Sequence, residues 1–210
     1  MDDFKKQLKI AYDKDAQRRD SAEGKRDQWK LDVRQQFIDL LNKESKKTIL
    51  ELGSGAGLDA KFFQENGFDV LATDLSPEMV KMCKKRGLHA RVLDLYDLSS
   101  LNKKFDGVFS LNVLLHVPRK DLDSILEKIL NVLTDGGLFL YGVYGGIDKE
   151  ETLIDHDKMG LPRFFSFFSD DTLKKVVSKR FEIVSFETAK LHVKRADLHF
   201  QAILLRKKNN

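Results

Sequence analysis

Hydrophobic and polar positions divide this chain into short apolar runs and longer segments with helical periodicity. The apolar runs are bounded by Gly, Pro, Asn or Asp, which is typical of strands. Between them, apolar residues recur every three or four positions, which predicts amphipathic helices. The predicted strands cover residues 48–52, 68–73, 88–93, 105–110 and 138–143. The predicted helices cover residues 58–66, 77–86 and 119–133, and a turn is predicted at residues 135–137.

The repeated strand–helix order sets the expected fold class. Such alternation favours a parallel, doubly wound sheet that binds ligands at the carboxyl ends of its strands. Near the end of the chain, a helix is predicted over residues 170–179, and strands over 181–188 and 199–206. The gap between these two strands is too short for a helical crossover, so we expect them to pair antiparallel. The sequence therefore predicts an α/β fold with a mostly parallel, seven-stranded sheet that ends in an antiparallel pair.

Two further helices are predicted ahead of the first strand. Apolar residues recur at helical spacing in residues 26–42 and, among more polar neighbours, in residues 3–20. No linker stands out in the 210 residues. We therefore expect an N-terminal helical cap over residues 1–44 and a main domain over residues 45–210, folded together as a single unit.

Composition and charge constrain the class of protein more than the fold. Hydrophobic residues make up 41% of the chain, as in an ordinary globular protein. The net charge is +4, but basic and acidic residues are interspersed, which favours a mixed, solvated surface. The first residues show no secretory segment, and the apolar stretch 108–117 is too short to span a bilayer. The only cysteine, Cys83, excludes an internal disulfide, which favours a cytoplasmic location, and its helical context predicts a buried, inert thiol.

The first predicted strand runs directly into a loop with glycine at every second position. Gly53, Gly55 and Gly57 permit a tight turn and a close approach of the backbone to a ligand. Asp74 ends the next strand, about 20 residues on, where an acid can accept both hydroxyl protons of a ribose. Asp94 follows the third strand, in place to meet an adenine amino group.

The residue after the loop separates two kinds of nucleotide site. A loop that binds pyrophosphate requires a small residue there, and this chain has Leu58. The pattern thus favours adenosine bound without a diphosphate. The alternative is that Asp74 and Asp94 are ordinary solvated or capping acids, and their placement one strand–helix unit apart disfavours it.

In these segments the chain resembles the class I S-adenosylmethionine-dependent methyltransferases, in their small-molecule branch. The resemblance covers roughly residues 45–145 and rests on Ile49–Gly57, Ala72–Ser76, Val92–Leu95, Phe105–Ser110, Asn112–His116 and Leu133–Gly137. The expected terminal strand pair is also similar to the end of that family's sheet. The resemblance implies a Rossmann-like methyltransferase fold, S-adenosylmethionine as cofactor and S-adenosylhomocysteine as product.

The resemblance also implies a set of cofactor contacts. The glycine loop would lie against the amino-acid part of the cofactor, Asp74 would hold the ribose, and Asn112 would lie under the sulfonium. A sulfonium cation also suits the acidic Glu51 better than a phosphate would. The full implied set is Glu51, Gly53, Ser54, Gly55, Asp74, Leu75, Met79, Asp94, Leu95 and Asn112.

A general base is the least determined part of this chemistry. Methyl transfer is an in-line displacement, so positioning supplies most of the acceleration. His116, after the fourth strand, is the candidate base for a hydroxyl or amine acceptor; alternatively it closes the pocket or bonds the backbone. His192 and His199 are expected at the surface or in the sheet, and His156 in a solvated loop, so no metal site is predicted.

The segment Pro162–Phe168 holds four phenylalanines where this family usually carries its acceptor lid. It is either an aromatic wall for the acceptor or edge-strand packing, and packing is expected for at least two of the four rings. The candidate acceptor-binding residues are Tyr12, Tyr141, Tyr144, Arg163 and Phe164. From the N-terminal helices, Arg18, Arg19 and Trp29 are further candidates among which spacing does not choose.

The leading hypothesis is a methyltransferase that moves a methyl group to an O or N atom of a small molecule, with no membrane partner and no assigned oligomeric state. A nicotinamide-dependent oxidoreductase is opposed by Leu58, Asp94 and the antiparallel tail. A nucleic-acid methyltransferase is disfavoured because residues 112–115 lack the Pro-Pro-aromatic sequence of amino-methylating enzymes. A catalytically silent cofactor-binding protein remains an alternative.

Overall fold

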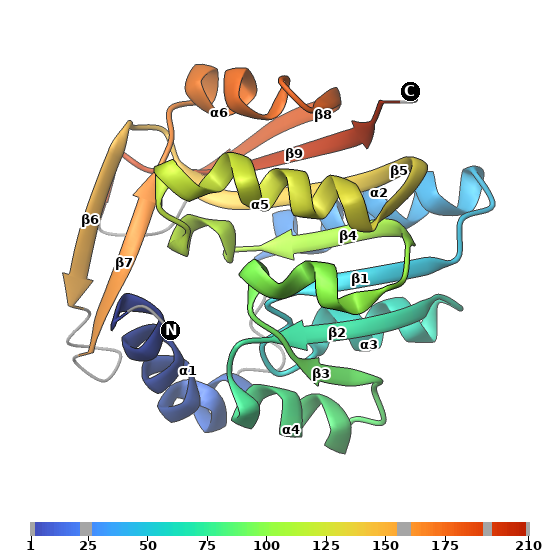
Figure 1. Cartoon of the computed structure of the whole chain (residues 1–210), viewed down its shortest axis with the longest axis horizontal. Helices are drawn as coiled ribbons and strands as arrows, with labels where there is room; N and C mark the ends of the chain where they lie inside the picture. The colour runs from blue at the N-terminus through green and yellow to red at the C-terminus, as the bar shows by residue number, and fades with distance from the viewer. Residues whose placement is uncertain (1–2, 22–26, 155–160, 191–194, 209–210) are drawn as a thin grey trace.

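The computed structural model describes residues 3–21, 27–154, 161–190 and 195–208. Its centre is a seven-stranded sheet in the order β3-β2-β1-β4-β5-β9-β8 (Figure 1). The strands are β1 Thr48–Leu52, β2 Asp69–Asp74, β3 Ala90–Val92, β4 Phe105–Leu111, β5 Leu133–Gly145, β8 Phe181–Lys190 and β9 His199–Lys207. The first five pair in parallel, and β9 runs antiparallel to both β5 and β8. The predicted sheet and its terminal antiparallel pair are confirmed.

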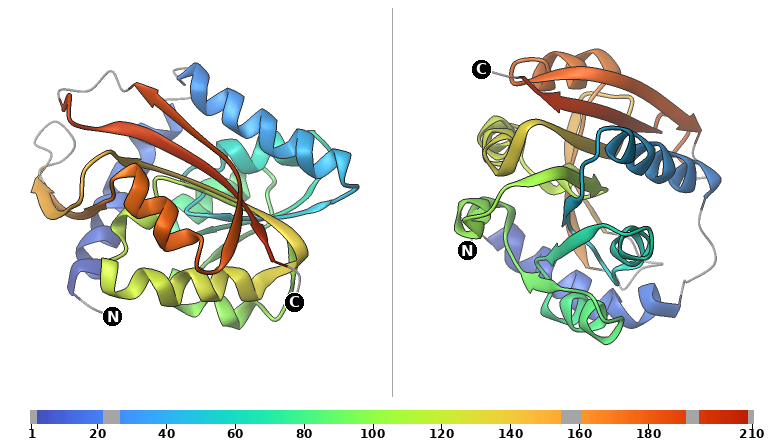
Figure 2. Two further views of the ribbon diagram at one scale, coloured as in Figure 1. Left: turned by 90° about the horizontal axis from the view of Figure 1, so that it is seen from above. Right: turned by 90° about the vertical axis from the view of Figure 1, so that its right-hand side faces the viewer.

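Helices cover both faces of this sheet, as the doubly wound prediction requires (Figure 2). One face carries α2 Gln28–Lys43, α3 Leu58–Glu65 and α4 Pro77–Lys85. The other carries the 3₁₀ segment η1 Leu95–Leu101, α5 Arg119–Val132 and α6 Asp170–Val177. Each face buries its own apolar cluster against the central strands, which gives a helix–sheet–helix sandwich.

The packing of α2 depends on a glycine in β4. A Cβ atom added at Gly107 would lie 2.8 Å from Phe37 Cζ and 3.1 Å from Leu41 Cδ1. Because no side chain intervenes, the rings of Phe37, Phe63 and Phe109 meet with centroids 4.9–6.1 Å apart. The second N-terminal helix is therefore part of the sandwich itself. The division of the chain into residues 1–44 and 45–210 stays a prediction.

The first helix, α1 Asp3–Ser21, lies elsewhere. It crosses the carboxyl ends of the parallel strands, where it contacts α4 and the strand β7 (Figure 1). β7 Pro162–Phe167 pairs antiparallel with β6 Lys149–Ile154 in a separate two-stranded sheet beside it. The 3₁₀ turn η2 Leu114–His116 follows β4 at the same edge and contacts β7. This edge therefore gathers segments that are distant in sequence.

The edge-strand alternative for Pro162–Phe168 is borne out by β7, which pairs with β6 in this separate hairpin. Two local predictions are corrected. The predicted turn at residues 135–137 lies inside β5, because pairing with β4 jumps from Leu133 to Leu138 and Gly136 takes a φ of +64°. The predicted strand 88–93 is shorter, at Ala90–Val92, because Asp94 starts η1 by accepting from Tyr96 N at 3.0 Å.

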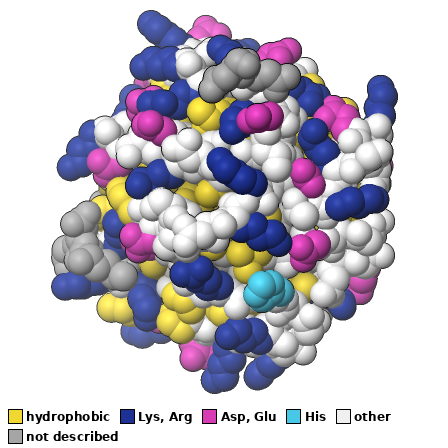
Figure 3. All heavy atoms as spheres, turned by 45° about the vertical axis from the view of Figure 1, so that its right-hand side comes forward, with side chains coloured by type: hydrophobic (Ala, Val, Ile, Leu, Met, Phe, Trp, Pro, Cys, Tyr) yellow, Lys and Arg dark blue, Asp and Glu magenta, His cyan; other side chains and the backbone are white. Residues whose placement is uncertain are grey.

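The face of the molecule seen in Figure 3 carries charges of both signs, as the sequence predicts. On the face shown in Figure 3, Lys and Arg side chains are scattered among Asp and Glu side chains rather than gathered in one patch. Among the described residues, no helix is long and apolar enough to cross a membrane, and no group of His, Cys, Asp or Glu could hold a metal ion.

Candidate functional site

The glycine loop between β1 and α3 has the backbone that only glycine adopts easily. Gly53 and Gly55 have φ values of +63° and +54°. A Cβ atom at Gly53 would lie 2.2 Å from Val113 Cγ2, so the loop packs directly on the segment after β4. A Cβ atom at Gly55 would meet nothing within 4 Å. The loop is thus tightly packed at its first glycine and open at its second.

Asp74, at the end of β2, is tied to this loop. Its Oδ2 accepts a hydrogen bond from Gly55 N at 2.9 Å, and its Oδ1 accepts one from Ser76 N at 2.8 Å. Ser54 N also donates to the Thr73 carbonyl oxygen at 2.9 Å. The ends of β1 and β2 are therefore locked together, with a half-buried carboxylate between them. Because a carboxylate oxygen accepts more than one hydrogen bond, Asp74 can still accept from a ligand.

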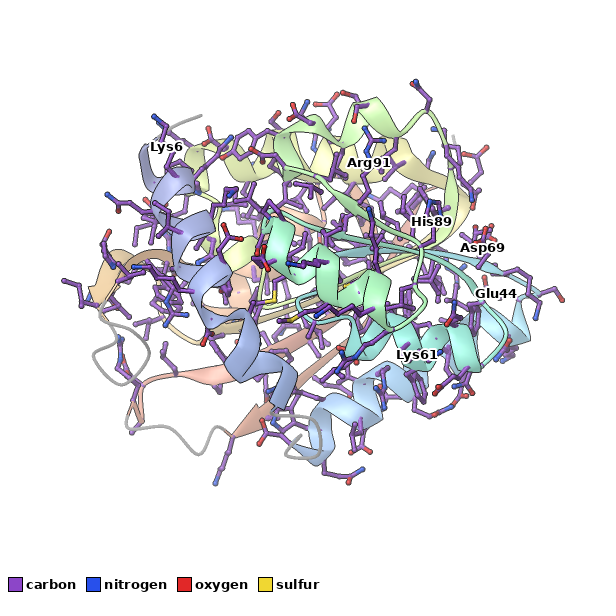
Figure 4. The ribbon with its side chains drawn as sticks, turned by 90° about the horizontal axis from the view of Figure 1, so that it is seen from below. Lys6, Glu44, Lys61, Asp69, His89 and Arg91 are labelled. Atoms are coloured by element: carbon purple, nitrogen blue, oxygen red, sulfur yellow. The ribbon has the colours of Figure 1, made fainter. Side chains whose placement is uncertain are left out.

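Asp94, one strand further, lies at a cavity of about 410 Å³. Its Oδ2 accepts from Lys5 Nζ of α1 at 3.1 Å, and the Lys5 ammonium lies 3.4 Å from the centre of the Tyr96 ring. The cavity is lined by Lys9, Leu75, Arg91, Val92, Leu93, Asp94, Asp97, Ser99 and Ser100. In Figure 4, which views the molecule from below, α1 runs beside α4, and Arg91 of the cavity lining is labelled. The cavity lies at the carboxyl ends of β2 and β3, where Leu75 and Asp94 follow these strands.

Glu51 and Asp74 give the part of this edge next to the glycine loop a negative field. Glu51 is 3% exposed, and its carbonyl oxygen accepts from Thr73 Oγ1 at 2.7 Å. Burial raises the pKa of the Cys83 thiol to about 11, and the negative charges of Glu51 and Asp74 add to the effect. The predicted burial of Cys83 is confirmed. A cationic ligand is therefore favoured here over a phosphate.

Asn112, directly after β4, has an unusual environment. Its φ is +57°, and its N–H donates to the Gly142 carbonyl oxygen at 2.7 Å. Its side-chain oxygen is buried and has no hydrogen-bond partner in the described part of the chain. A buried amide oxygen in this state is able to accept a hydrogen bond from a ligand. Among the other implied residues, Met79 is 1% exposed and Ser54 is 8% exposed, while Leu75 and Leu95 are half-buried.

His116 is 6% exposed and held on both sides. Its Nε2 lies 2.7 Å from the Tyr12 hydroxyl of α1, and its Nδ1 lies 2.7 Å from the Phe164 carbonyl oxygen of β7. The Phe165 ring packs against it with centroids 5.0 Å apart. The histidine therefore joins α1 to the hairpin, and neither ring nitrogen is left without a hydrogen bond.

The predicted acceptor residues separate into two groups. Tyr12 and Phe164 meet at His116, and the ring of Phe4 lies 6.0 Å from that of Phe164. Tyr141, by contrast, is fully buried in the core, where burial raises the pKa of its hydroxyl. Tyr144 packs on Phe200 at 5.9 Å, and the Arg163 guanidinium lies 5.4 Å from the centre of the Phe165 ring.

The remaining candidates are placed as follows. Phe167 and Phe168 are buried, which confirms packing for two of the four phenylalanines. The Trp29 ring packs at a tilt against the Phe200 ring, with centroids 3.8 Å apart, on the face covered by α2. His199 Nε2 bonds Asp170 Oδ1 at 2.7 Å between β9 and α6. His156, His192 and the side chains of Arg18 and Arg19 lie outside the described part of the structure.

Sequence reasoning missed Lys5 and Asp13, which fasten α1 to the site. Lys5 pairs with Asp94, and Asp13 accepts a hydrogen bond from Ser76 Oγ beside Asp74. Burial tends to raise the pKa of Asp13, but hydrogen bonds from Lys9 and Ser76 outweigh it and hold the pKa below its usual value. The signal was a four-residue spacing of Lys5, Lys9 and Asp13, which puts them on one helix face.

Known proteins are similar to this chain in two respects: in the sequence of the segment that holds the glycine loop, and in the fold. Residues 49–137 match a family model described as a methyltransferase domain. A ubiquinone biosynthesis O-methyltransferase of Xanthomonas oryzae is 34% identical over 100 residues, which cover 44% of this chain and 41% of that protein. A malonyl-[acyl-carrier protein] O-methyltransferase of Hamiltonella defensa is 33% identical over 98 residues, covering 46% and 37%. The chain thus spans less than half the length of these curated relatives.

Solved structures extend the likeness to almost the whole chain. The DhpI complex with S-adenosylhomocysteine has a TM-score of 0.75 at 18% identity, covering 99% of this chain and 98% of that one. The Burkholderia thailandensis 1,6-didemethyltoxoflavin-N1-methyltransferase, with its substrate and S-adenosylhomocysteine bound, has a TM-score of 0.69 at 20% identity, covering 97% and 88%. Residues 49–137 are therefore a methyltransferase domain, and the chain around them has the fold of the class I S-adenosylmethionine-dependent methyltransferases.

Proposed function

We propose that this protein transfers a methyl group from S-adenosylmethionine to an O or N atom of a small molecule and releases S-adenosylhomocysteine. The observation that carries the proposal is that the glycine loop and the two strand-end acids, Asp74 and Asp94, lie at one edge of the sheet. The open Gly55 is hydrogen-bonded to Asp74, and Asp94 lies at a cavity of about 410 Å³ at the same sheet edge. This is the place where a doubly wound sheet binds its ligand.

The residues of this edge fit S-adenosylmethionine. Asp74 and Asp94 are hydrogen-bond acceptors for the ribose hydroxyls and the adenine amino group, and Leu75 supplies apolar surface in the cavity. The buried side-chain oxygen of Asn112, with no partner among the described residues, suits a nearby positive charge. Gly55 leaves room for the backbone to approach the amino-acid part.

The mechanism follows from what these residues do. When bound, the cofactor supplies an electrophilic methyl carbon and a leaving thioether. Asp74 fixes the ribose through charged hydrogen bonds, and the rigid link to Gly55 keeps that oxygen in place. Glu51 and Asp74 stabilise the cationic cofactor through their negative field. The protein contributes chiefly orientation, which suits an in-line displacement.

The acceptor side of the proposal rests on α1, η2 and β7. These segments meet at His116, above the carboxyl ends of the strands, and they bring Tyr12 and Phe164 together there. A small-molecule acceptor is supported by the ubiquinone biosynthesis O-methyltransferase to which part of this chain is similar, and by the 1,6-didemethyltoxoflavin-N1-methyltransferase whose fold the chain shares. A cytoplasmic location is part of the proposal and is supported by the single, buried cysteine.

Calorimetry with two ligands tests the cofactor assignment. We expect S-adenosylhomocysteine to bind with a micromolar or lower dissociation constant, and NAD to show no heat of binding at the same concentrations. Binding of NAD instead would support the oxidoreductase alternative, and binding of neither would contradict the proposal. A methyl-transfer assay over a panel of alcohols, phenols, amines and carboxylates, with RNA as a further member, then identifies the acceptor class.

A further inference from the structure

The hydrogen bonds of His116 define its protonation. The Phe164 carbonyl oxygen can only accept a hydrogen bond, so His116 Nδ1, 2.7 Å away, must carry a proton. In the neutral imidazole, Nε2 then carries a lone pair and accepts the O–H of Tyr12 at 2.7 Å. The histidine thus has its basic nitrogen turned to a tyrosine hydroxyl, with its tautomer fixed by the backbone.

Tyr12 lies between two parts of the proposed cofactor site. His116 ends the 3₁₀ turn η2, and its N–H donates to the carbonyl oxygen of Val113, the residue against which Gly53 packs. On the other side, Asp13 bonds Ser76, which follows Asp74 closely. The half-buried Tyr12 is therefore held above the ends of β2 and β4. Under the proposed function, this is where the methyl end of the cofactor would lie.

The two faces of α1 explain how one helix achieves this. Phe4 and Tyr12 are eight residues apart and face the hairpin and η2. Lys5 and Asp13 have the same separation on the neighbouring face, toward β3 and α4. The helix is thus fixed by side-chain bonds along both faces, which sets the position of the Tyr12 hydroxyl closely.

We propose that Tyr12 is a catalytic residue that accepts the acceptor's proton, and that His116 is a positioning residue that drives the transfer by taking the proton of Tyr12. The proposal rests on the proposed methyltransferase function. As the acceptor's O or N atom bonds the methyl carbon, the carbon–sulfur bond breaks and its electron pair stays on sulfur. The acceptor's proton passes to Tyr12 Oη, while the Tyr12 proton passes to His116 Nε2. The resulting imidazolium keeps its Nδ1–H on the Phe164 carbonyl and later returns a proton to solvent.

The same two hydrogen bonds of His116 are also compatible with a purely structural role. In that case the residue serves only to fasten α1 to β7, and any side chain that replaces the Nδ1–H bond would serve as well. His116→Asn distinguishes the structural role from the proton-accepting role. Its amide N–H stands close to the place of Nδ1 and can donate to the Phe164 carbonyl, while no basic nitrogen remains.

Nuclear magnetic resonance of ¹⁵N-histidine-labelled protein tests the relay without an acceptor. We expect the His116 signals of a neutral ring protonated at Nδ1, and a shift of the Nε2 signal in Tyr12→Phe. The His199 signals should not move, because its Nε2 bonds Asp170. A His116 ring protonated at Nε2 alone, or a Nε2 signal unaffected by Tyr12→Phe, would overturn the proposal.

Methyl transfer to phenol, benzylamine and benzoate tests the catalytic role. With phenol or benzylamine, we expect Tyr12→Phe and His116→Asn each to lower kcat about 10²-fold, to change KM little, and to lose no more when combined. S-adenosylhomocysteine binding should stay unchanged in both, and the exposed control His89→Asn should keep full activity (Figure 4). If binding fails already in the wild type, the proposed function is wrong rather than the relay.

Three outcomes of this assay would contradict the relay while leaving the methyltransferase function intact. One is kcat retained in Tyr12→Phe. Another is full turnover in His116→Asn, which shows a structural role. The third is methylation of benzoate alone, since a carboxylate brings no proton to remove. If none of the three compounds is methylated, the resonance result decides.

Discussion

The cofactor side and the acceptor side of this crevice are built in different ways. On the cofactor side, loop and acids come from consecutive strand–helix units, and the Gly55–Asp74 bond joins backbone to side chain at 2.9 Å. On the acceptor side, Tyr12, His116 and Phe164 come from α1, η2 and β7, up to 152 positions apart, and meet at the His116 ring, which contacts the Tyr12 hydroxyl and the Phe164 backbone carbonyl. The first region is set by local sequence, and the second by tertiary contacts. Substitutions should therefore damage the two regions differently.

The largest effect is expected at Gly53. Gly53→Ala places a Cβ atom 2.2 Å from Val113 Cγ2 at a φ of +63°. Overpacking and the left-handed backbone together should lower the free energy of unfolding by about 2–5 kcal/mol. Gly55→Ala is the matched control, because its Cβ meets nothing within 4 Å and only the backbone strain of about 1–2 kcal/mol remains. Urea unfolding measures both, and equal losses would contradict the difference in packing.

A smaller effect is expected where α1 is fastened to Asp94. Lys5→Met removes an ion pair whose side chains are 11% and 17% exposed. We expect faster amide hydrogen exchange along α1, by a factor that corresponds to roughly 1 kcal/mol of local opening, with the strands unaffected. Lys6→Met, one position along and exposed, is the control (Figure 4). Protection of α1 that is equal in both variants would show that Lys5 does not hold the helix.

The smallest effect concerns Asp13 and pH. The pKa of its carboxyl is lowered in the folded protein, so its contribution is fully present above the unfolded pKa, about 3.9, and is lost as the pH falls through the folded value. Hydrogen exchange of α1 in the wild type should thus be slower than in Asp13→Asn from neutral pH down to about 4, after correction for intrinsic rates. The two proteins should converge below that. A difference that persists in strong acid would exclude the Asp13 charge as its source.

The same contrast explains what the sequence could predict. The strand–helix alternation, the antiparallel end and the loop with its acids follow from periodicity and from spacing along the chain, and the structure contains all three. A pyrophosphate-binding loop requires a small residue at one position, so Leu58 alone was enough to predict a different kind of site. These features are local, so a single sequence contains them.

The acceptor side could not be predicted from the sequence, because its residues meet only in the folded structure. The pairing of Tyr12 with His116 depends on where α1 crosses the sheet, and no local rule fixes that. The hairpin of β6 and β7 was missed because Lys149–Ile154 is polar and half-exposed, which resembles a loop. Tyr141 and Tyr12 were equal candidates by residue type, but only Tyr12 lies at His116, while Tyr141 is fully buried.

Asp74 is proposed to hold the ribose of S-adenosylmethionine, and calorimetry with S-adenosylhomocysteine on Asp74→Ala measures the strength of this contact. Loss of charged hydrogen bonds to two hydroxyls should weaken binding by roughly 2–4 kcal/mol. Asp74→Asn, which keeps the shape of the side chain, should also weaken binding of S-adenosylhomocysteine. Asp69→Ala, an exposed acid at the other end of β2 (Figure 4), should bind as the wild type does. If both Asp74 variants bind S-adenosylhomocysteine as tightly as the wild type does, Asp74 does not hold the ribose.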